Sequence, residues 1–391
     1  MKKVTKLMAA MAASALVMGA LTGCGGEKKA ADSNVIKIGG CLEMTGGNAS
    51  FGISAKKGID LALAEINKKG VLGGKKLELV VADTKSEASE ATNAMQKLIS
   101  QDKVVAVIGP NASSAVIASG AINNSTKVLD ITPMGTNPAV TVDDKGNVKP
   151  YSFRACFIDP FQGTVMANYL TGMGLKKAAV YIDNSSDYSK GLAKFFKENF
   201  EKNGGSVVIE EAFLAKDTDF KATLTKIKAT NPDVVYIPGY YQEVGLIVKQ
   251  AREMGIDVPM CGGDGWDAPN LAEIAGAAAL NNTFFCNLYS PDDTSDLNKK
   301  FVADFKQANN GENPNVFAAL AHDCALLVAK AIEDAGSADP AKINEAMAKI
   351  KGFPGVAGEV TFDQFHNPVK SAVIIEHVDG KQTFKASVAA K

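Results

Sequence analysis

Residues 104–136 read VVAVIGPNASSAVIASGAINNSTKVLDITPMGT, and this stretch decides the fold that we predict. It begins with an apolar run over residues 104–109 and ends with another over residues 128–132. Continuous apolar runs of this length are typical of parallel strands that are covered on both faces. Between them we predict a helix over residues 113–123, so the stretch indicates a strand, a helix and a second strand.

The same alternation extends to both sides of this stretch. In a helix predicted over residues 52–69, Ile59, Leu63 and Ile66 recur at steps of three and four. Further strands are expected at 35–41, 76–83, 177–183, 206–212, 233–238 and 258–261, and further helices at 87–100, 159–173, 188–203, 220–229 and 243–254. The pattern restarts near residues 151–159, where Asp159-Pro160 is typical of a helix N-cap and first turn. The sequence therefore predicts an α/β protein with two lobes of similar build.

The last part of the chain is richer in helices. We expect helices at 296–309, 315–335 and 340–349, and late strands at 359–362 and 371–378. So few strands cannot form a third sheet, and we expect these segments to complete the first two lobes. Lobe 1 would then comprise residues 35–157 and 290–362, and lobe 2 residues 158–289 and 363–391.

The composition excludes one broad class of function. The chain has 391 residues, of which 46% are hydrophobic, and this is too long for one compact domain by the usual size range. Its net charge is -1, and it has no basic stripe. We therefore expect no binding to nucleic acid. Arg154 and Arg252 are the only arginines, so few residues are available to clamp a phosphate or a carboxylate.

The first 24 residues have the pattern of an export signal. Three lysines precede an apolar stretch over residues 7–21, which is short for a membrane span. The stretch ends in LTGC at residues 21–24, which resembles the bacterial lipobox, in which the cysteine is diacylated. We predict a signal peptide over residues 1–23, lipidation of Cys24 and a polar tether over residues 24–34. The alternative is an ordinary signal peptide with an incidental cysteine. In either case we expect the protein to be extracytoplasmic, and lipidation would anchor it to the bacterial membrane.

The remaining cysteines and the histidines do not form a metal motif. Three histidines are scattered, and the cysteine spacings match no zinc or redox pattern. We expect no metal site and no cofactor, and we expect the cysteines to be small buried hydrophobic residues. These are Cys41, Cys156, Cys261, Cys286 and Cys324, an odd number that leaves at least one unpaired.

Polar and aromatic residues follow the predicted strands, where open α/β sheets bind ligands. In lobe 1, residues 44–47, 51–52, 111–114 and 133–136 bring hydroxyl groups and a helix N-terminus, which suit an anion. In lobe 2, Asp264 between glycines supplies a carboxylate, and Tyr188, Tyr240 and Tyr241 supply aromatic rings. A carboxylate and aromatic rings suit an ammonium group with its alkyl chain. The two lobes together fit the two ends of a zwitterion.

Each of these features also has an ordinary structural explanation. Ser113 alone can be an N-cap, Asp264 can be a turn residue, and Tyr240 and Tyr241 can belong to the surface. Their shared position at strand ends favours a binding site. The sequence contains no Gly-x-Ser-x-Gly, no phosphate-binding Gly-x-x-x-x-Gly-Lys and no Gly-x-Gly-x-x-Gly after the first strand. We therefore expect a binding protein rather than an enzyme.

From residue 35 nearly to its end, the chain resembles the leucine/isoleucine/valine-binding family of periplasmic (type I) solute-binding lipoproteins of ABC transporters. The resemblance implies two Rossmann-like lobes, joined by a hinge of three crossovers, that close on a ligand. It also implies a receptor that passes a free amino acid, with an aliphatic or branched side chain favoured, to a membrane permease. The matching stretches are 38–52, 58–70, 108–114, 131–138, 188–192, 236–245 and 262–266.

The resemblance further implies roles for individual residues. Ser113 and Thr136 would hold the ligand carboxylate. Asp264 and the backbone carbonyl of Met134 would hold the ammonium. The other residues of the implied binding site are Tyr188 and Tyr240, which close over the ligand, the aromatic walls Phe51 and Phe317, and the loop residues Asn111 and Ala112.

Three positions depart from the family pattern. Asp264 is one methylene shorter than the glutamate that is common there. Asn111 stands where leucine binders tend to place an apolar residue, which leaves room for a polar ligand. Ala112 occupies one position of a disulfide that some members form. Two alternatives therefore remain open: the same fold binding an amide, an organic acid or an aromatic acid, and an α/β lipoprotein enzyme.

Overall fold

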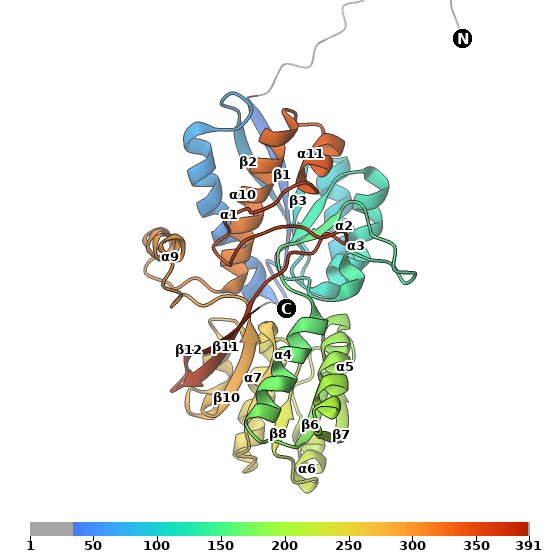
Figure 1. Cartoon of the computed structure of the whole chain (residues 1–391), viewed down its shortest axis with the longest axis vertical. Helices are drawn as coiled ribbons and strands as arrows, with labels where there is room; N and C mark the ends of the chain where they lie inside the picture. Colours follow the sequence, from blue (N-terminus) through green and yellow to red (C-terminus); the bar gives the residue numbers. More distant parts are fainter. Residues whose placement is uncertain (1–33, 390–391) are drawn as a thin grey trace, which may run out of the picture. The chain divides into compact units, whose positions relative to one another are not determined.

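Two β-sheets organise the part of the chain that the structure describes, residues 34–389 of this computed structural model (Figure 1). We call the unit around the sheet of five strands lobe 1 and the unit around the sheet of seven strands lobe 2. The predicted signal peptide, Cys24 and residues 24–33 of the predicted tether lie outside the described residues. None of the helices described in residues 34–389 combines the length and the apolar character needed to span a membrane.

The sheet of lobe 1 is entirely parallel and has the strand order β2-β1-β3-β4-β5. Because β1 lies between β2 and β3, the direction of the connections reverses there, and such a switch point is where ligands bind in this kind of sheet. Gly39 and Gly40 of β1 pair with Val107 and Ile108 of β3. The five strands are β1 (Val35–Leu42), β2 (Lys76–Asp83), β3 (Val107–Ile108), β4 (Asp130–Thr132) and β5 (Ser152–Arg154).

Helices cover both faces of this sheet, which is why its strands are continuous apolar runs. On one face α1 packs against α10, and on the other α2 packs against α3 (Figure 1). At Gly58 the first pair is so close that a Cβ atom would stand 2.0 Å from the carbonyl oxygen of Ala318. The helices of lobe 1 are α1 (Ala49–Lys69), α2 (Ala88–Ser100), α3 (Ser113–Thr126), α9 (Asp296–Ala308), α10 (Val316–Ala335) and α11 (Pro340–Met347), with the short 3-10 helix η1 (Pro138–Val140).

Lobe 2 repeats the topology of lobe 1 and extends it. Its first five strands lie in the order β7-β6-β8-β9-β10, which is the order of lobe 1, and β11 and β12 add to the β10 edge in antiparallel fashion. The strands are β6 (Lys177–Asp183), β7 (Ser206–Phe213), β8 (Val234–Tyr236), β9 (Met260–Gly262), β10 (Thr283–Asn287), β11 (Ala372–Val378) and β12 (Lys381–Val388). The helices are α4 (Asp159–Gly172), α5 (Asp187–Lys202), α6 (Lys221–Ala229), α7 (Tyr241–Glu253) and α8 (Leu271–Ala275), with the 3-10 helices η2 (Asp264–Trp266) and η3 (Ala278–Leu280).

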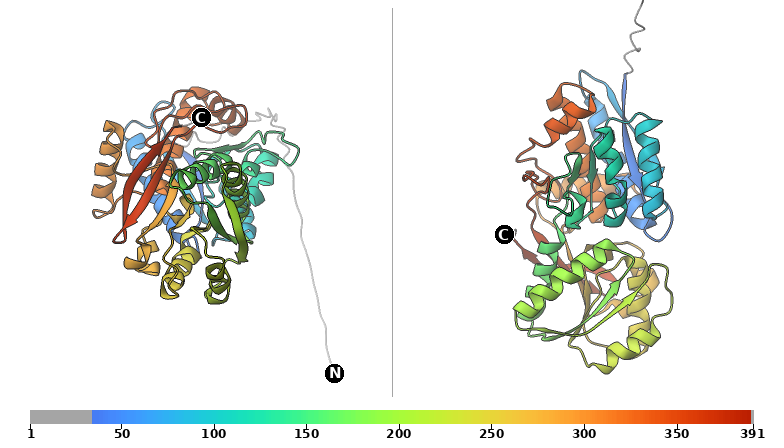
Figure 2. Two further views of the ribbon diagram at one scale, coloured as in Figure 1. Left: turned by 60° about the horizontal axis from the view of Figure 1, so that its bottom comes forward. Right: turned by 90° about the vertical axis from the view of Figure 1, so that its right-hand side faces the viewer.

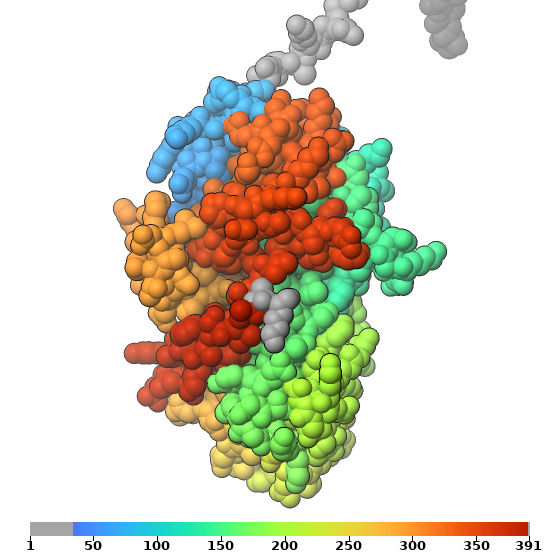
Figure 3. Space-filling model, in the orientation of Figure 1, coloured from blue at the N-terminus to red at the C-terminus, as the bar shows by residue number. Residues whose placement is uncertain are grey.

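The chain passes between the lobes three times, between β5 and α4, between β10 and α9, and between α11 and β11. Figure 2 shows the two lobes and the segments that join them. In the space-filling view the last of these segments runs over the surface from lobe 1 towards β11 (Figure 3). The predicted fold of two Rossmann-like lobes with three crossovers is confirmed.

Most predicted elements are present, and the exceptions have local causes. The strand predicted at 359–362 is wrong, because Val360 and Phe362 form only isolated bridges, with Phe353 and Pro368. Three strands were not expected. β5 has only three residues, and β12 is a mostly exposed, polar edge strand, so both lack the apolar run that marks a buried strand. β10 is fully buried, but it follows the short helices α8 and η3, so the sequence pattern does not show where the strand begins.

Candidate ligand-binding site

The switch point of lobe 1 is built around Glu43, which follows β1 and is fully buried. Its Oε1 atom accepts hydrogen bonds from the backbone N–H groups of Asn111 (3.0 Å) and Ala112 (3.1 Å), and its Oε2 atom accepts one from Asn111 Nδ2 (2.7 Å). Glu43 therefore fixes the loop that leads from β3 into α3. The sequence analysis missed this residue, although an acid that directly follows a buried strand was a signal for it.

This loop delivers Ser113 as the first residue of α3. Ser113 is buried, and its Oγ atom accepts a hydrogen bond of 3.2 Å from the backbone N–H of Asn137. Asn137 belongs to the loop after β4, which also carries Met134 and Thr136, and both are buried. The start of α3 and the loop after β4 are thus tied together. Hydroxyl groups beside a helix N-terminus form a surface that can hold an anion.

The first crossover completes the lobe 1 side of the site. Arg154 is fully buried and donates to the carbonyl oxygens of Gly135 (2.6 Å) and Asn137 (2.9 Å), which holds the loop after β4 in place. The backbone N–H of Asp159 donates to the carbonyl oxygen of Thr136 at 3.0 Å. Asp159 was predicted as the N-cap of the next helix. Instead Ile158 is the N-cap, and both carboxyl oxygens of Asp159 are buried without a hydrogen-bond partner.

On the lobe 2 side, Asp264 begins η2 and is 3% exposed. Its backbone N–H donates to Gln162 Oε1 at 2.8 Å, and the next backbone N–H, of Gly265, donates to the hydroxyl of Tyr188 at 3.2 Å. The Oδ1 atom of Asp264 has no hydrogen-bond partner. These contacts tie η2 to Gln162 of α4 and to Tyr188 of α5.

Asp159 and Asp264 are close enough to influence each other. Burial raises the pKa of Asp159 to about 8, and the charge of Asp264 acts in the same direction. Burial likewise raises the pKa of Asp264 to about 7, against the lowering effect of Gln162 and Tyr188. The Thr136 hydroxyl lowers the pKa of Asp159 but does not reach hydrogen-bond geometry with it. The charge of Arg154 lowers the pKa of Asp159. Even so, both carboxyl oxygens of Asp159 and the Oδ1 atom of Asp264 have no hydrogen-bond partner in the described chain.

The predicted aromatic residues form one continuous row between the lobes. Tyr188 stacks on Tyr240 with ring centroids 5.2 Å apart and an interplanar angle of 8°. Tyr240 meets Phe51 edge-on at 5.6 Å, and Phe51 stacks on Phe317 at 3.9 Å. Two of these rings belong to helices of lobe 1 and two to lobe 2. The row provides an apolar wall beside the two carboxyl groups.

Several buried polar atoms at this site lack a hydrogen-bond partner within the described residues, and most of them are acceptors. Buried polar groups are almost always paired, so each unpaired one calls for an explanation. A bound molecule that donates hydrogen bonds would satisfy the acceptors. The atoms are Asn111 Oδ1, Thr136 Oγ1, both carboxyl oxygens of Asp159, Gln162 Nε2 and Asp264 Oδ1.

A pocket of about 410 Å³ opens beside these residues and is lined by both lobes. Ala112 and Ser114 of lobe 1 and Tyr240 of lobe 2 belong to its lining. At its rim, Glu87 of lobe 1 forms an exposed ion pair with Lys216 of lobe 2. Because Ala112 and Ser114 flank Ser113 in the sequence, this pocket adjoins the start of α3.

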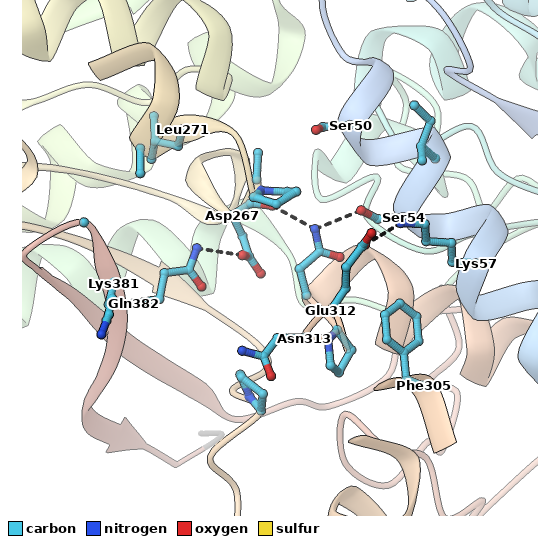
Figure 4. Close-up of a pocket in the computed structure, with 18 of the residues that line it drawn as sticks. Ser50, Ser54, Lys57, Asp267, Leu271, Phe305, Glu312, Asn313, Lys381 and Gln382 are labelled. Carbon is cyan, nitrogen blue, oxygen red and sulfur yellow. Dashed lines mark hydrogen bonds and ion pairs between the residues drawn. The ribbon is translucent and has the colours of Figure 1, made fainter. Parts of the chain in front are cut away.

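Figure 4 shows a different pocket, of about 470 Å³, between α1 and the segment that begins at Asp267. None of the predicted site residues lines it. The buried carboxylate of Asp267 is fully used there, since it accepts from the backbone N–H of Val316 (2.8 Å), from Gln382 (2.9 Å) and from Asn287 (2.9 Å). The pocket in Figure 4 therefore has a buried carboxylate that is already paired within the protein. We take the region at the switch points, and not this pocket, as the candidate site.

Comparison with known proteins identifies a family with this fold. The family model for periplasmic binding proteins matches residues 35–382. A leucine-binding protein, LivK, from Thermotoga maritima is 39% identical, with 90% of this chain and 99% of that chain covered and a TM-score of 0.85. The branched-chain amino acid binding protein LivJ from Streptococcus pneumoniae, solved with isoleucine, is 40% identical, with 91% and 100% covered and a TM-score of 0.85. A leucine-, isoleucine-, valine-, threonine- and alanine-binding protein of Pseudomonas aeruginosa is 30% identical, with 93% of this chain and 92% of that protein covered.

Proposed function

We propose that this chain, which belongs to the periplasmic binding protein family, is an extracytoplasmic receptor that binds a free amino acid between its lobes and delivers it to an ABC importer. The names of its relatives support this proposal, since they give leucine, isoleucine, valine, threonine or alanine as ligands. A small or branched aliphatic side chain is the first choice for the ligand. The permease of the importer is the proposed protein partner.

The observation that carries the proposal is the separation of two kinds of polar groups. The start of α3 and the loop after β4 offer Ser113, Thr136 and backbone N–H groups to an anion. The second kind is the carboxyl groups of Asp159, whose backbone N–H is bonded to Thr136, and of Asp264 in lobe 2, which have unpaired acceptor atoms. A zwitterionic amino acid has a carboxylate for the first set and three N–H donors for the second. Buried charges are stable only when they are paired, so the fit of the ammonium is decisive.

Each residue then has a defined contact in the proposed complex. Ser113 and Thr136 bind the carboxylate, while Asp264, Asp159 and the carbonyl of Met134 receive the ammonium. The ligand side chain lies against the aromatic row formed by Tyr188, Tyr240, Phe51 and Phe317, near Asn111 and Ala112.

The proposal also covers the export of the protein, its lipid anchor and the closure of its lobes. Residues 1–23 act as a signal peptide, Cys24 is lipidated, and residues 24–34 form a tether to the membrane. Lobe 1 comprises residues 35–157 and 290–362, lobe 2 comprises residues 158–289 and 363–391, and the two close on the ligand. The family is one of solute receptors, and we propose no reaction for this member.

The second candidate is a receptor for an organic or aromatic acid, which the aromatic row favours. Such a ligand would leave the carboxyl groups of Asp159 and Asp264 without a donor. It would also bring a negative charge into a buried region without an ammonium group to offset it. We therefore place it after the amino acid. Product analysis after incubation with any bound compound tests the remaining alternative, an enzyme.

Calorimetric titration of the purified protein with the amino acids and a panel of organic acids tests the proposal. For the best amino acid, Asp264→Ala should lose about 2–5 kcal/mol of binding free energy, and Asp264→Asn should also bind poorly, because it keeps the shape and loses the charge. The same molecule without its amino group should bind weakly to every variant.

Asp267→Asn is the matched control. Asp267 lies three residues further on and is equally buried, but its carboxylate is paired within the protein, so the preference for the amino compound should remain. If Asp264→Ala binds the amino acid as tightly as the wild type does, Asp264 is only a turn residue and the assignment of the site fails.

A further inference from the structure

The side chain of Asn111 contains a buried acceptor atom that no group in the described chain satisfies. Asn111 follows β3 at the switch point of lobe 1, two residues before Ser113, and is 2% exposed. Its Oδ1 atom has no hydrogen-bond partner among residues 34–389. A buried acceptor left without a donor destabilises the protein, so a bound group that donates to Oδ1 would stabilise the complex.

The orientation of this amide is set by Glu43. The carboxylate of Glu43 accepts from two backbone N–H groups at Oε1, and from Asn111 Nδ2 at Oε2, where the distance is 2.7 Å. Burial raises the pKa of Glu43, and its hydrogen bonds from Asn111 and Ala112 lower it. An ionised Glu43 only accepts hydrogen bonds, which agrees with the structure, where Asn111 Nδ2 donates to Oε2. The amide oxygen therefore points away from Glu43. Asn111 presents an acceptor to its surroundings, not a donor.

The position of Glu43 places this acceptor beside the start of α1. A Cβ atom on Gly52 would stand 2.3 Å from the carbonyl oxygen of Glu43, so the first turn of α1 packs directly on the residue that holds the amide. Phe51, the neighbour of Gly52, is the lobe 1 ring that joins the aromatic row. Asn111 and Phe51 thus both neighbour Glu43, and Asn111 stands two residues before Ser113 in the loop that leads into α3.

The two ends of the proposed ligand cannot supply the missing donor. The ligand carboxylate has no proton to donate. The ligand ammonium is matched to the carboxyl groups of Asp159 and Asp264, which have three unpaired acceptor oxygens between them. The donor that fits Oδ1 has to come from the side chain of the ligand.

We propose that Asn111 is a specificity residue that favours an amino acid whose side chain carries a hydrogen-bond donor, a hydroxyl or an amide, over a hydrocarbon side chain of the same shape. This inference rests on the proposed function, and it replaces the aliphatic side chain as first choice by one of similar shape that carries a hydrogen-bond donor. Valine and threonine have the same shape and differ only by a hydroxyl in place of a methyl group. They therefore isolate the contribution of the acceptor.

The test is a calorimetric comparison of three ligands on the purified protein. L-threonine and L-allo-threonine place the hydroxyl in the two different positions at Cβ, and L-valine has methyl groups in both. A fixed acceptor is directional, so one hydroxy amino acid should bind about five- to tenfold more tightly than valine, and the other should not. Equal binding of valine and both hydroxy amino acids by the wild type overturns the proposal.

Asn111→Leu keeps the branching of the side chain and removes the acceptor. It also removes the bond to Glu43, but that loss affects all three ligands alike, so the ratio of their affinities is the readout. The ratio should move in favour of valine by about tenfold or more. Asn48→Leu, in the lining of the pocket of about 410 Å³, should leave the ratio unchanged.

The outcomes separate this inference from the function on which it rests. A variant Asn111→Leu that keeps the preference for a hydroxyl group would show that another group, or a bound water molecule, recognises it. Tight binding of valine without any gain for threonine leaves the amino acid receptor intact and refutes the role of Asn111. Failure of all amino acids to bind refutes the proposed function itself, and the wild-type comparison decides the matter even if Asn111→Leu does not fold.

Discussion

The Oγ atom of Ser114 in lobe 1 accepts a hydrogen bond of 2.9 Å from the backbone N–H of Asp187 in lobe 2. The carbonyl oxygen of the same Asp187 accepts a second one, of 2.8 Å, from the side chain of Asn137. Ser114 belongs to the first turn of α3, and Asp187 is the first residue of α5. The lobes are therefore bonded to each other directly beside the candidate site, at the point where each sheet is expected to face the ligand.

This contact predicts a role for Ser114 in closure of the lobes. Ser114→Ala removes one hydrogen bond between the lobes and should weaken ligand binding by about 0.5–1.5 kcal/mol, mainly through faster dissociation. Calorimetry and stopped-flow kinetics measure the two effects. Small-angle scattering should show a smaller radius of gyration with saturating ligand in the wild type.

Ser119→Ala is the control for this prediction. Ser119 is also buried in α3, but its hydroxyl donates within the helix, to the carbonyl oxygen of Ala115 at 2.9 Å. It should affect stability and leave the dissociation rate unchanged. An unchanged dissociation rate in Ser114→Ala, or a radius of gyration that does not respond to ligand, contradicts the predicted closure.

The contact between α1 and α10 predicts an unusual sensitivity at Gly58. A Cβ atom there would stand 2.0 Å from the carbonyl oxygen of Ala318, a backbone atom that cannot move aside. Gly58→Ala should therefore lower the free energy of unfolding by about 1–3 kcal/mol, measured by denaturation with urea. Gly120→Ala in α3 is the control, because no atom lies within 4 Å of its Cβ position and alanine favours a helix. If Gly58→Ala leaves the free energy of unfolding unchanged, α1 and α10 can move apart without loss of stability, and the prediction is wrong.

The fold could be predicted from the sequence because its signals are local. The apolar runs over β1, β6 and β8 and the helical spacing in α1 mark buried strands and their crossovers without any knowledge of the partners. The strand predicted at 359–362 was wrong because its apolar pattern does not show whether a partner strand lies beside it. Val360 and Phe362 are buried, but each forms only an isolated bridge, with Phe353 and with Pro368.

The site could be predicted only in part, because strand ends are visible in a sequence and their neighbours are not. Ser113 and Asp264 follow strands, and that position was enough to select them as candidates. Asp159 was interpreted as an N-cap, since nothing local shows that its carboxyl group is turned away from its own helix. Glu43 was missed because its role depends on a loop 68 residues further along the chain.

The predicted lipid anchor can be tested although Cys24 lies outside the described residues. Cys24→Ala removes the thiol that would be acylated, so the variant should lose metabolic acyl label and should be found in the soluble fraction after cell lysis. The wild type should carry the label and partition with membranes. A variant that stays with the membranes and keeps its label would show that Cys24 is an incidental cysteine.

The last prediction concerns pH, and its sign follows from the two buried acids. Burial raises the pKa of Asp264 to about 7 and that of Asp159 to about 8, so both groups are largely protonated in the free protein at pH 5. An ammonium group requires an ionised partner, so binding at that pH must release a proton. Affinity should therefore rise with pH between 5 and 8, by at most about tenfold per pH unit for each proton released.

The stability of the unligated protein should change in the opposite direction. In the unfolded chain these carboxyl groups titrate near 3.8, so between pH 4 and 8 the folded state binds more protons than the unfolded state. The free energy of unfolding contributed by this pair must then fall as pH rises through that window. The melting temperature without ligand should decline more in the wild type than in Asp159→Asn, which removes one of the two titrating groups.

Because the two acids interact, their titration is shared, and Asp159→Asn should also make ligand affinity less dependent on pH. An affinity that is flat from pH 5.5 to 8.5 in the wild type would mean that neither carboxyl group meets the ammonium.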